Sequence, residues 1–445
     1  MKLRLIQIRD SLADSFWFLP ALMALLAGGA ALGSVALDHK IGSGWVQSIG
    51  WVWSGGADGA RGVLSVVAGS VMTVVSIVFS LTISVLAQTS SHFGPRVLRN
   101  FTSDRKVQFT LGTFISTFVY CLLVLRTVRS VEESAFVPYL SVNIGVLLAL
   151  ASLAVLIFFI HHISQSIQAE NLIAAVGEDF QNSLTVLFPE RIGQPQNDAQ
   201  SRCKPPDENQ WRDALQVHAD ENGYLQRVDD EQFMRLATEH DCILKLDKRP
   251  GDFVASGSPL LRVLASPPFS SQSQSTLRAC FSLGRHRTPH QDALYSIQQL
   301  VEIAAHALSP GINEPFTALT CIDWLGASLR GVAERELPSP LRHDEAGHLR
   351  VIVDTLDFKK IARAAFDQIR IYGASNPDVM LNLLRIITEI APVLHRATDR
   401  DVLIQHAQLI GTDAAQIDNE ADRQRVEQRL RDTLHALAQS DTEEA

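Results

Sequence analysis

Residues 62–91 are a stretch of thirty uncharged amino acids, GVLSVVAGSVMTVVSIVFSLTISVLAQTSS, and this stretch decides the class of the protein. A helix needs about 20 apolar residues to cross the roughly 30 Å of hydrocarbon in a bilayer. Three other apolar stretches of suitable length flank it, at residues 16–37, 107–127 and 136–160. The sequence therefore predicts an α-helical membrane domain of about four transmembrane helices within residues 1–162.

The first of these stretches could be either a retained helix or a cleaved signal peptide. Ser34-Val35-Ala36 weakly resembles a cleavage site. The apolar run is 22 residues long, which exceeds the apolar core of an ordinary signal peptide. We therefore expect a retained transmembrane helix.

The charged residues divide the chain into two unlike parts. Residues 1–162 contain 11 Lys and Arg against 7 Asp and Glu, and the remainder contains 28 against 41, so the net charges of +4 and −13 add to the −9 of the whole chain. A charge-poor, slightly basic part followed by a charge-rich acidic part is typical of a membrane module joined to a water-soluble domain. The acidic domain also argues against nucleic acid as a partner, because nucleic-acid binding requires basic surfaces.

Basic residues in the loops predict the orientation in the membrane. Seven Lys and Arg lie in the N-terminal tail and in the loop after the second helix, against four in the other two loops. This bias and the even number of helices predict a multi-pass protein of the bacterial inner membrane with both termini in the cytoplasm. Basic residues in the loop after the second helix are expected to contact anionic lipid head groups: Arg96, Arg99, Arg105 and Lys106.

One face of the second predicted helix is polar along its whole length. Its residues follow one another at steps of three or four, which places them on one side of a helix. Hydrocarbon does not favour such a face, so it should contact protein or water. Close packing against neighbouring helices and a solute pathway lined by hydroxyls both remain open. The residues of this polar strip are Ser65, Gly69, Thr73, Ser76, Ser80, Ser84, Gln88 and Ser91.

The remainder of the chain predicts an α+β cytosolic domain in three parts. Residues 163–210 contain a polar continuation of the fourth helix and a linker, residues 211–285 are β-rich, and residues 286–445 are mainly helical. Short strands separated by glycine turns suggest a small β barrel or sandwich. The expected elements are a strand from Gly223, a helix at 229–239, strands at 242–246, 253–254, 260–264, 276–283 and 349–353, and helices at 291–308, 313–330 and from about 358, 377 and 400.

A tight corner between two predicted helices is a candidate ligand site. Ser309-Pro310-Gly311 should end one helix, and Asn313 should cap the next, with Pro315 in its first turn. Backbone amides at such a helix start can bind an anion or a carboxylate, although a plain helix–helix corner is equally compatible with the pattern. The ligand-binding candidates are Ser309, Gly311, Asn313, Glu314 and Thr317.

A weak metal candidate lies just before this region, at His286, His290 and Asp292. These residue types can ligate a metal, but no HExxH motif or fixed ligand spacing accompanies them. The polar face of an ordinary amphipathic helix explains the pattern as well. We therefore expect no metal and no cofactor.

No P-loop, GxSxG or GxGxxG motif opens a helix, so ATPase, hydrolase and dinucleotide-binding functions lack support. None of the five cysteines belongs to a CxxC pair, which favours unpaired small hydrophobic side chains. The cysteines are Cys121, Cys203, Cys242, Cys280 and Cys321.

Several short motifs resemble the bacterial predicted membrane-protein family known as domain of unknown function 2254. The most specific of them are Arg249-Pro250-Gly251-Asp252, Gln291-Asp292 and Ala307–Pro315 with Thr317-Ala318. The resemblance covers nearly the whole chain and implies a polytopic inner-membrane protein without an assigned activity. The supporting motifs in the membrane part are Phe79-Ser80-Leu81-Thr82, Pro95-Arg96, Asn100-Phe101, Leu111-Gly112-Thr113-Phe114 and Phe118-Val119-Tyr120-Cys121.

Three functional hypotheses follow. The first is a non-enzymatic homo-oligomer in the lipid bilayer, with a channel or solute pathway lined by the polar strip and regulated by the cytosolic domain. The second is a membrane-anchored sensor or scaffold that binds a cytosolic ligand at residues 309–317. The third is a membrane-anchored metal enzyme that uses His286, His290 and Asp292.

Overall fold

The computed structural model describes residues 15–41, 55–97, 101, 104–129, 136–187, 205–265, 270–289, 291–292 and 294–439. The chain divides into two compact units, Met1–Asn171 and Leu172–Ala445. Each unit has its own helices and its own apolar core, so each is described by itself.

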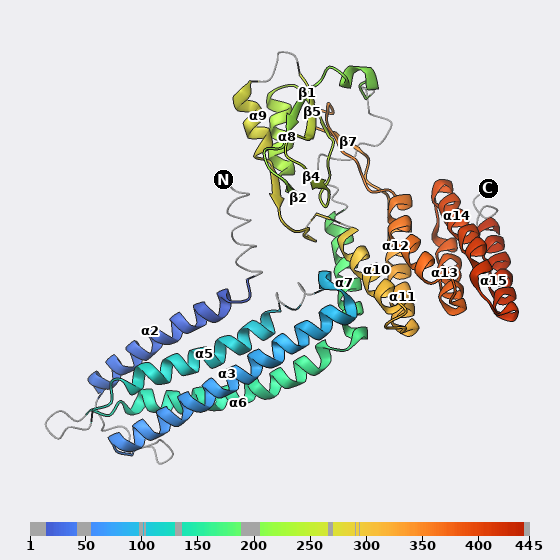
Figure 1. Ribbon diagram of the computed structural model, residues 1–445. Helices are drawn as coiled ribbons and strands as arrows, with labels where there is room; N and C mark the ends of the chain where they lie inside the picture. The colour runs from blue at the N-terminus through green and yellow to red at the C-terminus, as the bar shows by residue number, and fades with distance from the viewer. Residues whose placement is uncertain are drawn as a thin grey trace. The chain divides into compact units, whose positions relative to one another are not determined.

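The first unit contains four helices that are long and apolar enough to cross a membrane, which confirms the predicted number. They run alternately up and down the unit (Figure 1). The first helix continues beyond residue 37, where its predicted end lay, and so brings Asp38 into the helix. The four helices are α2 (Phe18–Ile41), α3 (Ala57–Phe93), α5 (Arg105–Leu125) and α6 (Tyr139–Ser166).

Helix α5 is the central helix of this unit. It packs against α2, α3 and α6, and 61% of its apolar stretch is buried, against 17–22% in the other three helices. A Cβ atom at Gly112 would lie 2.5 Å from Met23 Sδ and 3.3 Å from Pro20 Cα, so the absence of a side chain at Gly112 lets α2 approach α5 closely. The other helices expose apolar side chains such as Leu25, Leu150 and Ile157, as expected where helices meet lipid.

Helix α3 is longer than a membrane span requires. Its 37 residues correspond to about 55 Å at 1.5 Å per residue. A helix of this length that crosses the roughly 30 Å of hydrocarbon tilts or extends beyond it. Helix α3 ends at Phe93. Its C-cap, Gly94, has a positive φ of 90° and is followed by a short 3-10 turn at Pro95–Val97.

The sequence predicted that the fourth helix continues beyond residue 163, but the helix is broken. Helix α6 ends at Ser166, with Ile167 as its C-cap. A new helix, α7 (Ala169–Leu187), starts three residues later and runs from the first unit into the second. Within the second unit α7 is held by Trp324, whose indole lies directly over Gly177.

The second unit contains two small open sheets, so of the predicted barrel or sandwich the closed barrel is not formed. One has the strand order β1-β5-β3-β8-β7 and the other the order β4-β2-β6. All neighbouring pairs are antiparallel except β3 and β8, which are parallel. The strands are β1 (Leu215–His218), β2 (Gly223–Val228), β3 (Ile243–Leu246), β4 (Phe253–Val254), β5 (Pro259–Leu264), β6 (Phe281–Gly284), β7 (Leu341–His343) and β8 (Leu349–Ile352).

One apolar core joins the two sheets with α8 (Asp230–Glu239), the short helix predicted at 229–239. The strand predicted at 276–283 is wrong in its first half, since residues Ser271–Arg278 form helix α9. The hydroxyl of Ser270 caps this helix by accepting the backbone N–H of Ser273 at 3.1 Å. Only Leu277 of α9 is buried, so its sequence has no apolar periodicity from which a helix could be predicted.

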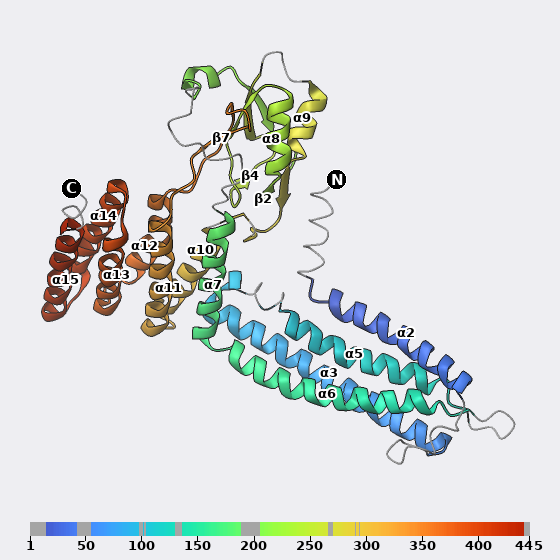
Figure 2. The same cartoon turned by 180° about the vertical axis from the view of Figure 1, so that it is seen from behind.

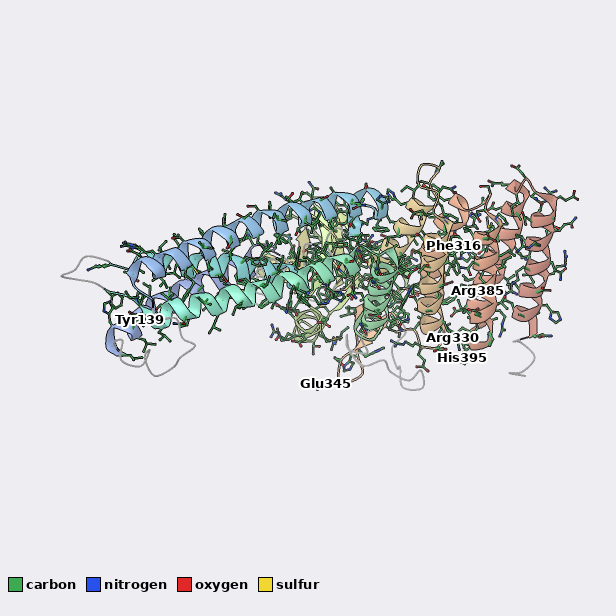
Figure 3. All side chains as sticks on the ribbon, turned by 90° about the horizontal axis from the view of Figure 1, so that it is seen from below. Tyr139, Phe316, Arg330, Glu345, Arg385 and His395 are labelled. Atoms are coloured by element: carbon green, nitrogen blue, oxygen red, sulfur yellow. The ribbon has the colours of Figure 1, made fainter. Side chains whose placement is uncertain are left out.

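Six helices follow and stack as three pairs in two rows, as in an α-solenoid. Helices α10, α12 and α14 pack along one row, and α11, α13 and α15 along the other (Figures 1 and 2). Arg385, labelled in Figure 3, joins α13 to α11 through Asp323 at 2.5 Å. The helices are α10 (Leu294–Ala307), α11 (Pro315–Ala333), α12 (Phe358–Tyr372), α13 (Pro377–Ile390), α14 (Ala397–Asp413) and α15 (Glu420–Gln439).

Candidate functional site

The polar strip of α3 lies on the outside of the first unit. All eight of its residues, from Ser65 to Ser91, are exposed. The buried side of α3 is formed instead by residues such as Leu64, Val71, Val78 and Val85. The strip is therefore not covered by α2, α5 or α6.

The hydroxyls of α3 are bonded to their own helix where the structure gives them a partner. Thr73 donates to the carbonyl of Gly69, and Ser76 to that of Met72, both at 3.1 Å. Such bonds satisfy a hydroxyl without a neighbouring chain and let it lie in an apolar environment. The strip thus consists mainly of small, uncharged side chains, and some of their hydroxyls already donate to carbonyls of the same helix.

Exposed apolar side chains border the strip. Val66 is 69% exposed and Ile77 61% exposed, and both lie beside the polar residues on the helix surface. Small residues four apart, such as Ser65, Gly69 and Thr73, allow a second helix to approach closely in a membrane. The outer face of α3 therefore combines features of a helix-packing surface and of a polar lining.

At one end of the first unit, the carboxylate of Asp38 caps helix α6. Asp38 lies in the last turn of α2 and is only 5% exposed. Its oxygens accept the backbone N–H groups of Leu140 and Ser141 at 2.8 and 3.0 Å and the Ser141 hydroxyl at 2.7 Å. Ser34 and Tyr120 extend this buried network, with their hydroxyl oxygens 2.9 Å apart. The network fixes α2, α5 and α6 together where α6 begins.

At the other end, Asp104 serves two helices. One carboxylate oxygen accepts the backbone N–H of Lys106 at 2.8 Å and so caps α5, and the other lies 2.5 Å from His162 Nε2 on α6. The predicted lipid-facing residues Arg96, Arg105 and Lys106 are exposed near this end. Arg99 lies outside the described residues.

The corner before α11 is exposed, but its amides are largely occupied. Ser309 O accepts the N–H groups of Ile312 and Asn313 at 3.1 and 2.9 Å, and the N–H of Glu314 bonds to Ala307 O at 2.8 Å. The predicted cap is displaced by one residue: Glu314 is the N-cap, and Asn313 adopts a left-handed φ of 51°. Pro315 lies in the first turn, as predicted.

The side chains at this corner offer little to an anion. The Glu314 carboxylate accepts the Thr317 hydroxyl at 3.3 Å and places a negative charge where an anion was expected. Gly311, Asn313 and Glu314 are exposed, and Ser309 and Thr317 are half-buried. The most exposed large side chain is Phe316, at 82% (labelled in Figure 3). The corner thus presents an aromatic ring and a carboxylate rather than free amides.

Of the weak metal candidates, Asp292 is already held by an arginine. Its carboxylate is 2.6 Å from the Arg287 guanidinium and almost fully buried; burial raises the pKa of Asp292, and Arg287 opposes that shift. His286 is exposed, and His290 lies outside the described residues. No group of three or more potential metal ligands is found in the part of the chain that the structure describes.

The two distinctive motifs at residues 249–252 and 291–292 come together in the second unit. Gly251 has a φ of 97°, and a Cβ there would lie 2.5 Å from a carboxylate oxygen of Asp292. Gln291 bonds to both backbone groups of Val228, accepting its N–H at 2.8 Å and donating to its carbonyl at 3.2 Å. These motifs join the turn, strand β2 and the start of α10, which is a structural role.

The capping role of Asp38 and the burial of Arg342 and His343 were not predicted from the sequence. Asp38 follows an uncharged run directly, and a lone acid in that place could have been singled out as a helix-capping residue. Arg342 and His343 are 3% and 6% exposed on β7, and nothing in their local sequence signals burial. Their position depends on strand pairings that join distant parts of the chain.

Comparisons with known proteins agree with the membrane character of the first unit. The family model described as predicted membrane protein (DUF2254) matches residues 13–389, which leaves α14 and α15 beyond the match. Uncharacterized proteins from Mycobacterium bovis and Mycobacterium tuberculosis are each 34% identical over 400 residues, covering 86% of this chain and 73% of the relative. No solved structure matches the chain significantly. The chain therefore belongs to the DUF2254 family of predicted membrane proteins.

Proposed function

We propose that this protein forms a homo-oligomer in the bacterial inner membrane, with both termini in the cytoplasm. In this assembly the polar strips of α3 from several copies face one another and line a solute pathway, and the second unit, on the cytoplasmic side, regulates it. The observation that carries the proposal is the exposure of all eight strip residues on the outside of a single chain.

The dimensions of the strip support this arrangement. Residues 65–91 extend over about 39 Å as a helix, enough to cross the hydrocarbon layer. A polar helix face of that length is expected to meet protein or water rather than lipid. Small side chains at four-residue intervals permit close contact between copies, and hydroxyls that bond to their own backbone leave a lining without charges.

Paired substitutions on the strip test the proposal. The variant with Ser76→Leu and Ser80→Leu fills the strip with bulk, and should lower the oligomeric state in detergent or change ion flux in reconstituted vesicles. Ser70→Leu is the matched control, because Ser70 is an exposed serine of the same helix, rotated by about 80–120° around the helix axis from the two substituted positions. If the double variant and the control both behave as the unsubstituted protein in both assays, the proposal fails.

A membrane-anchored sensor or scaffold that binds a cytosolic ligand is the second candidate. The 82% exposure of Phe316 beside Glu314 at the α10–α11 corner favours it, since aromatic residues are enriched at protein contact sites. Phe316→Ala should then weaken the binding of a partner without lowering the melting temperature. A thermal-shift screen of cationic and aromatic compounds against full-length protein, repeated with this variant, distinguishes the two candidates.

A further inference from the structure

Two buried arginines on the β7–β8 hairpin differ in how their charges are balanced. Arg350, 8% exposed, contacts Asp344 at 2.7 Å and Asp241 at 2.6 Å. Arg342, 3% exposed, donates from Nη1 to the carbonyl of Ser339 but has no carboxylate within 4.0 Å among the described residues. Its Nε–H is buried and has no acceptor there. Arg350 thus has two carboxylate partners, whereas Arg342 has none among the described residues.

The position of Arg342 in the sheet explains why its charge is poorly solvated. It pairs with Val351 of β8, and Val351 pairs with Leu244 of β3. Side chains directly opposite one another share a face of the sheet. Val351 and Leu244 are fully buried members of the apolar core, so Arg342 lies at the edge of that core. Burial lowers the pKa of Arg342, and no neighbouring group offsets this effect.

Hydrogen bonds on either side of Arg342 fix the strand that carries it, and the Ser339 carbonyl holds its Nη1. The Ser339 hydroxyl accepts the N–H of Leu341 at 3.1 Å, and the carbonyl of Pro340 accepts the N–H of Val353 at 3.0 Å. An arginine cannot relieve the burial of its charge by losing a proton, because its pKa is too high. A buried, fixed and unneutralised guanidinium needs an anionic partner to offset its desolvation.

We propose that Arg342 anchors a binding site for a small oxyanion, a phosphate or carboxylate group, at the β7 edge of the five-stranded sheet. A guanidinium binds both groups through parallel N–H donors, and the unbonded Nε–H supplies one of them. The tip of the hairpin that carries the site includes Glu345, labelled in Figure 3. Strand β7 bulges between Arg342 and His343, so the alternation of a regular strand does not separate these two side chains. The site is independent of the α3 strip.

Thermal unfolding of the full-length protein in detergent, at constant ionic strength, tests this site. Replacing chloride by phosphate or acetate should raise the midpoint of the unsubstituted protein in a saturable way; whichever anion acts at the lower concentration identifies the preferred group. Arg342→Met keeps an unbranched, mainly aliphatic side chain and removes the guanidinium and its charge. This variant should lose the anion-dependent rise and should not melt lower than the unsubstituted protein without the anion.

Arg350→Met is the matched control. It breaks two ion pairs and should lower the midpoint, yet it should keep the anion-dependent rise. Equilibrium dialysis with radiolabelled phosphate and acetate gives a second readout, with one anion bound per chain and at least a tenfold weaker affinity in Arg342→Lys. No specific rise and no bound anion in the unsubstituted protein, or equal effects in the Arg342 variants, would overturn the proposal.

Discussion

Asp38 of α2 accepts the backbone N–H of Ser141 at 3.0 Å, so one helix of the first unit supplies the cap of another. A cap from the preceding residue stabilises only its own helix, whereas this one also ties the two helices together. The bond lies at the end of the unit where a helix start would otherwise leave buried amides without acceptors.

Replacing Asp38 by Ala should destabilise the first unit. The change removes the acceptor for two amides and one hydroxyl, and the loss of a helix cap costs about 1–2 kcal/mol. Asp38→Asn keeps one acceptor oxygen and should cost less. Thermal unfolding in detergent measures both effects. Asp58→Ala is the control, because Asp58 is 94% exposed and lies 3.8 Å from Arg61. Equal melting of the Asp38 and Asp58 variants would show that the cap contributes nothing.

The Gly177→Ala substitution should disturb the packing of α7 against Trp324 in the second unit. A Cβ at this position would lie 2.6 Å from Cδ2 of Trp324, an atom of the rigid indole ring that cannot bend away. Overpacking of this kind costs about 1–3 kcal/mol, measurable as a lower midpoint of denaturant unfolding. Trp324→Leu in the same chain should recover part of the loss. Gly311→Ala is the control, because a Cβ there meets nothing within 4 Å; a Gly177→Ala variant as stable as this control contradicts the prediction.

Stability should fall on acidification through His406. This side chain is 3% exposed against Phe366 at the α12–α14 contact. Burial lowers the pKa of His406, and Asp367, 3.6 Å away, opposes the shift without reversing it. The unfolded chain therefore takes up a proton at a pH where the folded chain does not.

The contribution of neutral His406 should be complete above about pH 6.5, the usual histidine pKa. It should be lost as the pH falls further, at up to about 1.4 kcal/mol per pH unit. His406→Gln should flatten the pH dependence of the unfolding midpoint between pH 5 and 7. His435→Gln, at an exposed position, should leave it unchanged. Identical pH profiles for both variants and the unsubstituted protein would refute the assignment.

The four described cysteines should resist alkylation in the folded protein. Cys121, Cys242, Cys280 and Cys321 are buried and unpaired. Burial raises the pKa of Cys242 to about 11 and that of Cys280 to about 12. Only about one Cys242 thiol in a thousand is then ionised at pH 8, and the thiolate is the reactive form. In a Cys203→Ser background, iodoacetamide should label no thiol before denaturation and four after it. Rapid labelling of the native protein would contradict this.

The membrane part could be predicted from residue order because hydrocarbon excludes charge over long local runs. The run at 62–91 identified α3, and the pattern of small residues identified its polar face. The outward orientation of that face could not be predicted, since it depends on which side of α3 the central helix α5 contacts. Asp38 was missed because its partner lies about 100 residues further along the chain.

The second unit was harder to predict because its sheets combine distant segments. Strand β8 lies between β3 and β7, and the local sequence near Ile243 does not predict that Val351 lies on the neighbouring strand. A barrel or sandwich was predicted from glycine turns, which determine where strands end but not whether a sheet closes into a barrel. The buried state of Arg342 follows from the same distant pairing, which is why no motif announced it.

The parallel pairing of β3 with β8 also dictates an order of events during synthesis. Residues 247–348 must leave the ribosome before β8 can join the sheet. At about 5–20 residues per second, this takes roughly 5–20 s. Throughout that delay β3 has an open edge, which is prone to aggregation. Helices α10 and α11 emerge within the same interval, so the nascent chain can begin its helical stack before its larger sheet is complete.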